Sequence, residues 1–179
     1  RIEDGLPDLS ECGITPEALK NVNNIFIVAC GTAMHAGMVG KYVIEKLARV
    51  SVTVDIASEF RYRDPLLGKD DLVVIISQSG ETADSLAALR EAKELGAKTL
   101  GIVNVIGSSI AREADNVLYT LAGPEIAVAT TKAYSTQLVA GYLLAIEFGR
   151  VRGNITEEQY QNFIADIQKY EEEVTSKRC

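Results

Sequence analysis

The feature that most constrains the fold is an apolar run that ends abruptly in hydroxyl-bearing residues. Leu72 to Ile76 are five consecutive apolar residues, and four of them are β-branched. Such a run is typical of a strand buried on both faces, as in a parallel sheet covered by helices. Apolar residues then recur at helical spacing from Ala83 until Gly96, which suits the end of a helix. The sequence therefore predicts a strand, a polar turn and a helix in direct succession.

The turn between this strand and this helix is rich in uncharged hydrogen-bond donors: Ser77, Gln78, Ser79 and Thr82. The first turn of the helix adds unpaired N–H groups and the positive end of the helix dipole, and Gly80 allows a ligand to approach the backbone. These features favour a phosphate monoester site. The alternative is that Ser79 or Thr82 only caps the helix within an ordinary polar loop. Neither G-x-x-x-x-G-K-[ST] nor G-x-G-x-x-G occurs, so no nucleotide-binding pattern is present.

Four further apolar runs have the character of buried strands, at residues 25–29, 52–56, 99–103 and 117–121. Helical patterns follow at 34–47, briefly after Gly107, and at 131–150. This alternation predicts an α/β fold, a doubly wound five-stranded parallel sheet with helices on both faces. In the flavodoxin-like strand order 2-1-3-4-5, the polar turn at 30–33 faces the one at 77–79, where such sheets bind ligands.

The chain divides into three parts. Residues 1–24 form an opening segment with a short helix at 16–20, residues 25–152 form the α/β domain that carries the expected phosphate site, and residues 153–179 form a charged helix or linker that opens with a capping box at Thr156 to Gln159. Because the chain begins at Arg1 rather than Met, we expect it to be a piece of a longer protein. The apolar stretch Leu138 to Ile146 predicts a helix covered on its second side by another domain or subunit, hence a homodimer.

Charge and cysteine content exclude several classes of function. The net charge of -7 argues against nucleic acid or an anionic membrane surface as the main partner. No apolar run approaches the roughly 20 residues of a membrane span, and no signal peptide opens the chain. Cys12, Cys30 and Cys179 lack the spacing of a disulfide framework or a zinc site. We therefore expect a cytoplasmic protein without a metal.

Four segments, taken in order, resemble one enzyme family. They are Cys30-Gly31-Thr32, Ala57 to Arg63, Ser77 to Asp84 and Val128 to Ala133. The series is similar to successive motifs in the isomerase part of the glutamine:fructose-6-phosphate amidotransferases, also called glucosamine-6-phosphate synthases, and it spans roughly residues 25 to 152. The segment Ser-Gln-Ser-Gly-Glu-Thr alone indicates only a sugar isomerase (SIS) domain, whereas the set in this order is more specific.

The resemblance implies a part of an enzyme that makes glucosamine 6-phosphate from fructose 6-phosphate and glutamine. Such enzymes carry a glutaminase and then two SIS domains, and this chain looks like the first SIS domain only. The family more often has Ser where Ala33 stands, so this chain lacks that hydroxyl. The family's pattern implies phosphate binding by Ser77, Gln78, Ser79 and Thr82, and a sugar pocket lined by Thr32, Val128 and Thr130.

The resemblance also implies that this part of the enzyme has no catalytic residues, because the family's ring-opening histidine, isomerising glutamate and lysine lie in the second SIS domain. We expect the chain to bind fructose 6-phosphate or glucosamine 6-phosphate without a cofactor and to be inactive alone. Isomerisation needs a base, and three candidates are present. His35 is better explained as a packed or capping residue, Glu81 as a carboxylate placed favourably at a helix N-terminus, and Lys132 as an ion-pair partner.

Three alternatives stay open. The charged residues Glu59, Arg61 and Arg63 are either a solvated run or, with the interleaved Phe60 and Tyr62, an interface. The chain could be a sugar-phosphate-sensing SIS module of a transcriptional regulator, although it shows no basic recognition helix. It could also be a stand-alone phosphosugar isomerase, although the catalytic His and Glu of such an enzyme are not evident.

Overall fold

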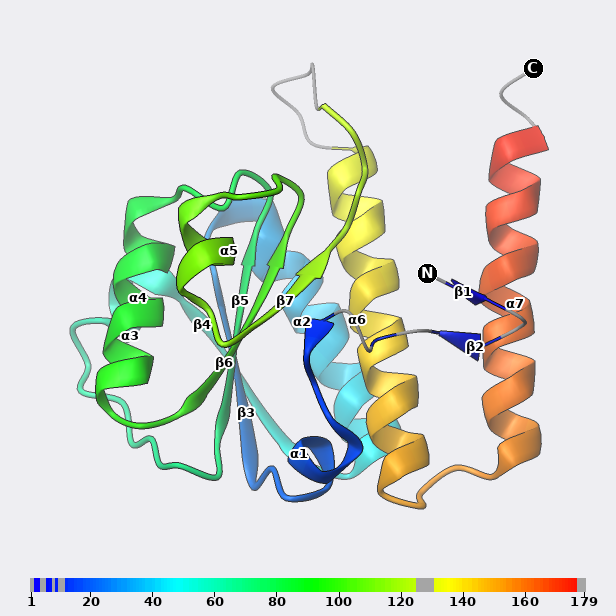
Figure 1. Ribbon diagram of the computed structural model, residues 1–179, viewed down its shortest axis with the longest axis horizontal. Helices are drawn as coiled ribbons and strands as arrows, with labels where there is room; N and C mark the ends of the chain where they lie inside the picture. The colour runs from blue at the N-terminus through cyan, green and yellow to red at the C-terminus, as the bar shows by residue number, and fades with distance from the viewer. Residues whose placement is uncertain (1, 4–5, 8, 10–11, 125–130, 177–179) are drawn as a thin grey trace.

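The computed structural model describes residues 2–3, 6–7, 9, 12–124 and 131–176. Its centre is a five-stranded parallel sheet in the order β4-β3-β5-β6-β7 (Figure 1). Numbered along the sheet-forming part of the chain, this is the order 2-1-3-4-5 that the sequence predicted. The strands are β3 (Asn24–Ala29), β4 (Ser51–Ile56), β5 (Leu72–Ser77), β6 (Lys98–Val103) and β7 (Asn116–Tyr119).

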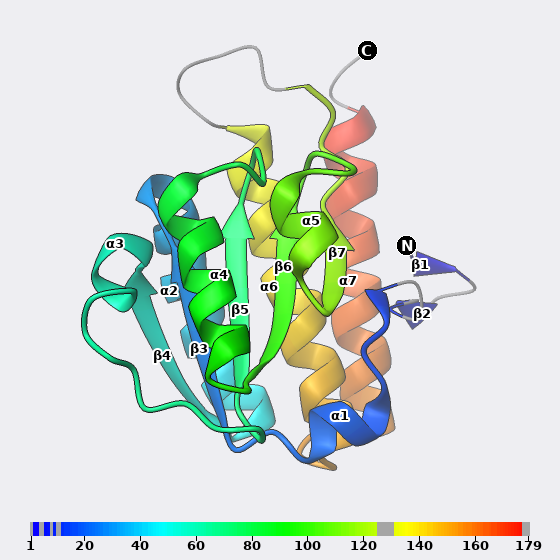
Figure 2. The same cartoon turned by 60° about the vertical axis from the view of Figure 1, so that its left-hand side comes forward.

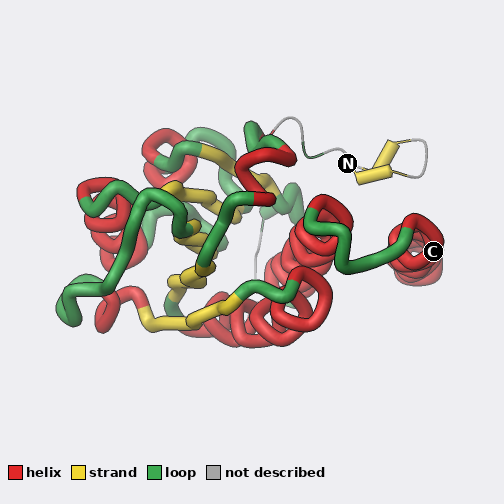
Figure 3. The backbone as a smooth tube through the Cα atoms, turned by 90° about the horizontal axis from the view of Figure 1, so that it is seen from below, coloured by secondary structure: helices red, strands yellow, loops and turns green. Residues whose placement is uncertain are grey.

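Helices cover both faces of the sheet, as the end-on view shows (Figure 3). One face carries α1 (Pro16–Lys20), α2 (Gly31–Ala48) and α6 (Lys132–Val151). The other face carries α3 (Ala57–Phe60), α4 (Ala83–Glu94) and α5 (Ser109–Glu113). In Figure 2, α4 and α5 lie in front of the sheet. The doubly wound fold is therefore confirmed.

The core has two layers because successive side chains of a strand point to opposite faces of a sheet. Within β5, Val74 packs with the α2 and α6 layer, whereas Val73 and Ile75 pack with the α3, α4 and α5 layer. All six residues of β5 are buried, which fits its apolar sequence and its place between two neighbouring strands. The polar turn that follows this central strand therefore lies at the carboxyl edge of the sheet.

The C-terminal helix α7 (Glu157–Ser176) begins at the predicted capping box. The backbone N–H of Gln159 donates to Thr156 Oγ1 at 3.2 Å, and the N–H of Thr156 donates to Gln159 Oε1 at 2.9 Å. Helix α7 packs on the C-terminal part of α6 through Ile146, Tyr160 and Ile164. The second side of α6 is thus covered partly by the chain's own last helix.

Three details differ from the sequence-based expectation. The opening segment contains a small antiparallel pair, β1 (Ile2–Glu3) with β2 (Leu6–Pro7), that no pattern indicated. Helix α3 was not predicted either. Strand β7 ends at Tyr119 rather than at residue 121, because Asn104 Oδ1 accepts a hydrogen bond from the backbone N–H of Ala122 at 2.7 Å and Leu121 takes a φ of 50°.

Candidate functional site

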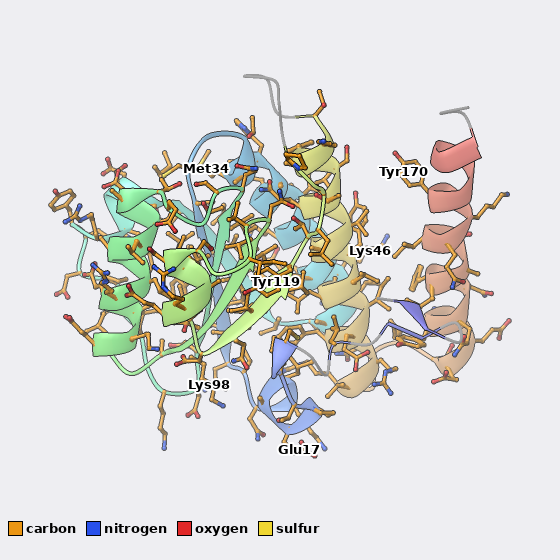
Figure 4. All side chains as sticks on the ribbon, turned by 45° about the horizontal axis from the view of Figure 1, so that its top comes forward. Glu17, Met34, Lys46, Lys98, Tyr119 and Tyr170 are labelled. Atoms are coloured by element: carbon orange, nitrogen blue, oxygen red, sulfur yellow. The ribbon has the colours of Figure 1, made fainter. Side chains whose placement is uncertain are left out.

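Two polar turns meet where neighbouring parallel strands end. In the register of β3 and β5, Ala29 lies beside Ile76, so the turns that follow the two strands lie side by side at the carboxyl edge of the sheet. Figure 4 shows Met34, from the first turn of α2, near this edge, whereas Lys98 and Glu17 lie at the opposite end of the molecule. The predicted juxtaposition of the two turns is present in the structure.

A pocket of about 160 Å³ opens between these turns. Five of the seven residues predicted to bind substrate line it, namely Thr32, Ser77, Gln78, Ser79 and Thr82. The other two, Val128 and Thr130, lie outside the described residues. The rest of the lining comprises Cys30, Ala33, Ile76, Ser85 and Gln137. None of these ten side chains carries a formal charge, so any attraction for an anion comes from hydrogen bonds and helix dipoles.

Thr82 occupies the N-cap position of α4, but its hydroxyl does not cap the helix. Thr82 Oγ1 instead lies 3.2 Å from Ser77 Oγ, across the mouth of the turn. An N-cap side chain usually satisfies one of the unpaired N–H groups of the first helical turn. Cys30, at the N-cap of α2, also makes no capping hydrogen bond through its side chain. Two long helices therefore begin beside the pocket without side-chain caps, an arrangement that suits an anionic ligand.

The turn itself is held by its own hydroxyls. The backbone N–H of Gly80 donates to Ser77 Oγ at 3.0 Å, and the N–H of Glu81 donates to Ser79 Oγ at 3.2 Å. Gly80 has a φ of +67°, a conformation that side chains disfavour. These contacts fix the positions of the two serines before any ligand binds. Such preorganisation lowers the cost of binding.

Glu81 does not line the pocket and instead contacts helix α5. Its Oε1 accepts a hydrogen bond from the backbone N–H of Ser109, at the start of α5, at 2.7 Å. Hydrogen bonds from Ser109 hold the pKa of Glu81 below its ordinary value, so the group is a carboxylate at neutral pH. The expected placement at a helix N-terminus is present, although the helix is α5 rather than α4. The carboxylate thus links the turn between β5 and α4 to the next crossover helix, α5.

Gln137 joins the pocket from α6, about sixty residues further along the chain. The residue is 3% exposed, and its Oε1 has no hydrogen-bond partner. Helix α6 reaches this position by packing closely on α2, where a Cβ added to Gly141 would lie 3.7 Å from the Cα of Gly40. A buried acceptor left unpaired costs roughly 1–3 kcal/mol. Gln137 was not predicted from the sequence; the available signal was its position, as a polar residue just before the apolar run that begins at Leu138.

A second hollow of about 360 Å³ adjoins the first and shares Gln78 with it. It lies at the ends of β6 and β7, and its lining is mainly apolar: Asn104, Val105, Ile106, Leu121, Gly123 and Pro124. Ile106 and Leu121 are 71% and 62% exposed. Gln78 thus stands between a polar pocket and an apolar hollow.

The remaining candidates lie elsewhere. His35 is exposed on α2, so of its two expected roles, packed or capping, the packed one is wrong. Arg61 pairs with Asp84 at 3.2 Å, and Arg63 pairs with Asp55 at 2.6 Å. These basic residues bind neighbouring elements of the chain rather than the pocket. Among residues 12–124 and 131–176, no group of three or more His, Cys, Asp or Glu residues forms a candidate metal site.

None of the helices in the described ranges combines the length and the apolar character that a membrane span requires.

Comparison with known proteins agrees with this geometry. The family model described as "SIS domain" matches residues 18–147. The glutamine–fructose-6-phosphate aminotransferase (isomerizing) of Clostridium acetobutylicum is 56% identical over 182 residues, which cover 99% of this chain and 30% of the relative. The enzyme of the same name from Clostridium tetani is 61% identical over 153 residues, which cover 86% of this chain and 25% of the relative. The chain thus spans less than a third of the length of these curated relatives.

A solved structure extends the comparison to the fold. The C-terminal domain of glucosamine-fructose-6-phosphate aminotransferase from Francisella tularensis superposes with a TM-score of 0.89 at 41% identity, covering 93% of this chain and 47% of that one. Its fold and its sequence both resemble those of this chain. Since the family model also matches well over half of its residues, the chain belongs to the SIS domain family.

Proposed function

We propose that the chain is the sugar-phosphate-binding SIS domain of a glutamine–fructose-6-phosphate aminotransferase (isomerizing). In this proposal the pocket between the β3 and β5 turns binds the phosphate of fructose 6-phosphate or glucosamine 6-phosphate. The observation that carries it is the convergence of Thr32, Ser77, Gln78, Ser79 and Thr82 on one pocket. The names and identities of the curated relatives support the choice of enzyme.

The chemistry of the pocket suits a phosphate ester. Hydroxyl and amide groups donate to phosphate oxygens, and a hydrogen bond to an ionised group contributes about 1.5–3 kcal/mol net. Several such bonds, less the cost of immobilising the ligand, are compatible with a Kd near 1 mM, or about 4 kcal/mol. None of the described lining residues is Lys or Arg, so binding of a phosphate ester here would rest on hydrogen bonds and helix dipoles rather than on a local positive charge.

The proposal assigns this chain binding without catalysis. The base and the ring-opening acid of the reaction would come from the second SIS domain, and ammonia from the glutaminase domain, of the parent enzyme. Glu81 is already engaged by Ser109, and His35 does not line the pocket. The proposal also includes a homodimer and a cytoplasmic location.

A titration tests the proposal directly. Fructose 6-phosphate added to the ¹⁵N-labelled chain should shift the backbone resonances of residues 77–82 with a Kd of about 1 mM, and fructose at the same concentrations should not. Thr82→Val keeps the shape of the side chain but removes Oγ1, and we expect about tenfold weaker binding. Thr53→Val, on the exposed side of β4, is the matched control. An equal response to fructose and fructose 6-phosphate would contradict the phosphate site.

A further inference from the structure

The unpaired oxygen of Gln137 adds a hydrogen-bond acceptor to a pocket whose other polar groups can donate. Ser77, Ser79 and Thr82 each have a hydrogen-bond partner within the turn, and their hydroxyls can rotate to donate to a ligand. Gln137 Oε1 is different, because a carbonyl oxygen only accepts hydrogen bonds. It is buried at the pocket and unsatisfied. A ligand that fills this pocket completely must therefore bring a donor as well as an anion.

The ligand's phosphate does not satisfy Gln137. The oxygens of a phosphate dianion are acceptors, so one placed against Oε1 would be repelled rather than bound. A hydroxyl or amino group is the complementary partner. In a sugar phosphate held with its phosphate at the N-terminus of α4, the groups that remain free to donate are the hydroxyls of the sugar carbons.

We propose that Gln137 Oε1 accepts a hydrogen bond from a hydroxyl group of the sugar and thereby selects polyhydroxylated phosphate esters over inorganic phosphate. This inference rests on the proposed function and adds a specificity-determining residue to it. The turn between β5 and α4 supplies affinity for the anion, and α6 supplies the acceptor that binds a hydroxyl of the sugar. Because Gln137 is held in the core with 3% exposure, its carboxamide is positioned before the ligand arrives.

Two ligands and two variants separate these roles. Gln137→Met keeps the length of the side chain but removes the acceptor, and Gln161→Met makes the same change at an exposed position of α7. The affinities of the 179-residue chain for fructose 6-phosphate and for inorganic phosphate are measured by NMR titration. We expect Gln137→Met to raise the Kd for fructose 6-phosphate about tenfold, equivalent to about 1.4 kcal/mol. Its Kd for inorganic phosphate should stay within about twofold of the wild-type value, and Gln161→Met should change neither.

The outcomes are distinguishable. If the wild-type chain binds fructose 6-phosphate and Gln137→Met binds it equally well, the inference fails and the proposed function stands. Equal weakening for both ligands would also overturn it, because the residue would then act on the pocket's structure alone. If the wild-type chain binds neither ligand, the proposed function fails and takes this inference with it.

A measurement on the wild-type chain avoids any effect of the substitution on folding. The side-chain NH₂ resonances of Gln137 should shift on addition of fructose 6-phosphate and stay in place on addition of inorganic phosphate. Their failure to respond to fructose 6-phosphate, while residues 77–82 do respond, would overturn the role of Gln137.

Discussion

In the turn between β5 and α4, Gly80 has no room for a side chain. A Cβ built on it would lie 2.1 Å from Ser108 Oγ and 2.5 Å from Ser108 Cβ, and its φ is +67°. Gly80→Ala combines left-handed backbone strain of about 1–2 kcal/mol with overpacking of about 1–3 kcal/mol. We expect a loss of about 2–5 kcal/mol in the free energy of unfolding, measured in urea.

A second glycine, Gly96, allows the backbone strain in this loss of stability to be separated from the steric clash. Gly96 has a φ of +85°, but a Cβ added to it would meet no atom within 4 Å. Gly96→Ala should therefore lose only the strain of about 1–2 kcal/mol. Adding Ser108→Gly to Gly80→Ala should restore part of the stability through a favourable coupling in the double-mutant cycle. Equal losses for the two Gly→Ala variants would show that the contact with Ser108 is unimportant.

Glu81 makes the turn sensitive to acid. Its pKa is lowered in the folded chain, because hydrogen bonds from Ser109 favour the carboxylate. A lowered pKa in the folded state means that the stabilisation is present above the ordinary value of 4.5 and is lost as the pH falls through the folded value. Glu81→Gln should thus be less stable than wild type near pH 7. Urea unfolding between pH 7 and 3 should show this difference shrinking toward zero, and a constant difference would contradict the assignment.

The elements show what sequence patterns can specify. The five strands, the four longer helices and the strand order were predictable because buried parallel strands are continuously apolar and the crossover rules leave few topologies. Helix α3 was not, since a single turn has no periodicity and depends on tertiary burial, with Phe60 fully buried. In the pocket, the turn residues were predictable from their position after a strand. The role of Gln137 was not predictable, because the helical pattern of α6 does not indicate which strand of the sheet ends beside the start of that helix.

Helices α6 and α7 are joined by a polar cluster of the buried Glu147 and Tyr160 with the exposed Arg150. The hydroxyl of Tyr160, which is 2% exposed, donates to Glu147 Oε2 at 3.4 Å, and Arg150 Nε donates to the same oxygen at 3.1 Å. Arg150 also lies over the Tyr160 ring, 5.2 Å from its centroid. Burial, together with the nearby charge of Glu147, raises the pKa of Tyr160 to about 12. The cluster therefore requires a neutral Tyr160.

This cluster predicts an alkaline loss of stability. Because the pKa of Tyr160 is about 12 in the folded chain and 10 ordinarily, its stabilisation is present below pH 10 and is lost as the pH rises toward 12. The full loss amounts to about 2–3 kcal/mol. Tyr160→Phe lacks this titration, so the wild type should lose stability relative to the variant in urea unfolding between about pH 9.5 and 11.5. Parallel curves for the two proteins would exclude this role for Tyr160.

At the scale of the whole molecule, the pocket depends on both faces of the sheet. Thr32 follows β3 on the α2 side, Thr82 begins α4 on the opposite side, and Gln137 comes from α6. A ligand that contacts all three binds only when the two core layers are assembled around β5. Such a ligand binds the native state and not the unfolded chain, so it shifts the unfolding equilibrium of the domain as a unit.

Fructose 6-phosphate should therefore raise the melting temperature of the chain in one cooperative transition. A free concentration about ten times the Kd adds about 1.4 kcal/mol to the free energy of unfolding. For a chain of this size that corresponds to a rise of about 3–5 °C in scanning calorimetry. Fructose at the same concentration should give no rise, and Thr82→Val should give a smaller one because its Kd is higher. A rise confined to one of two separate transitions would mean that the ligand stabilises a single layer, and the pocket would then not be the junction of the two core layers.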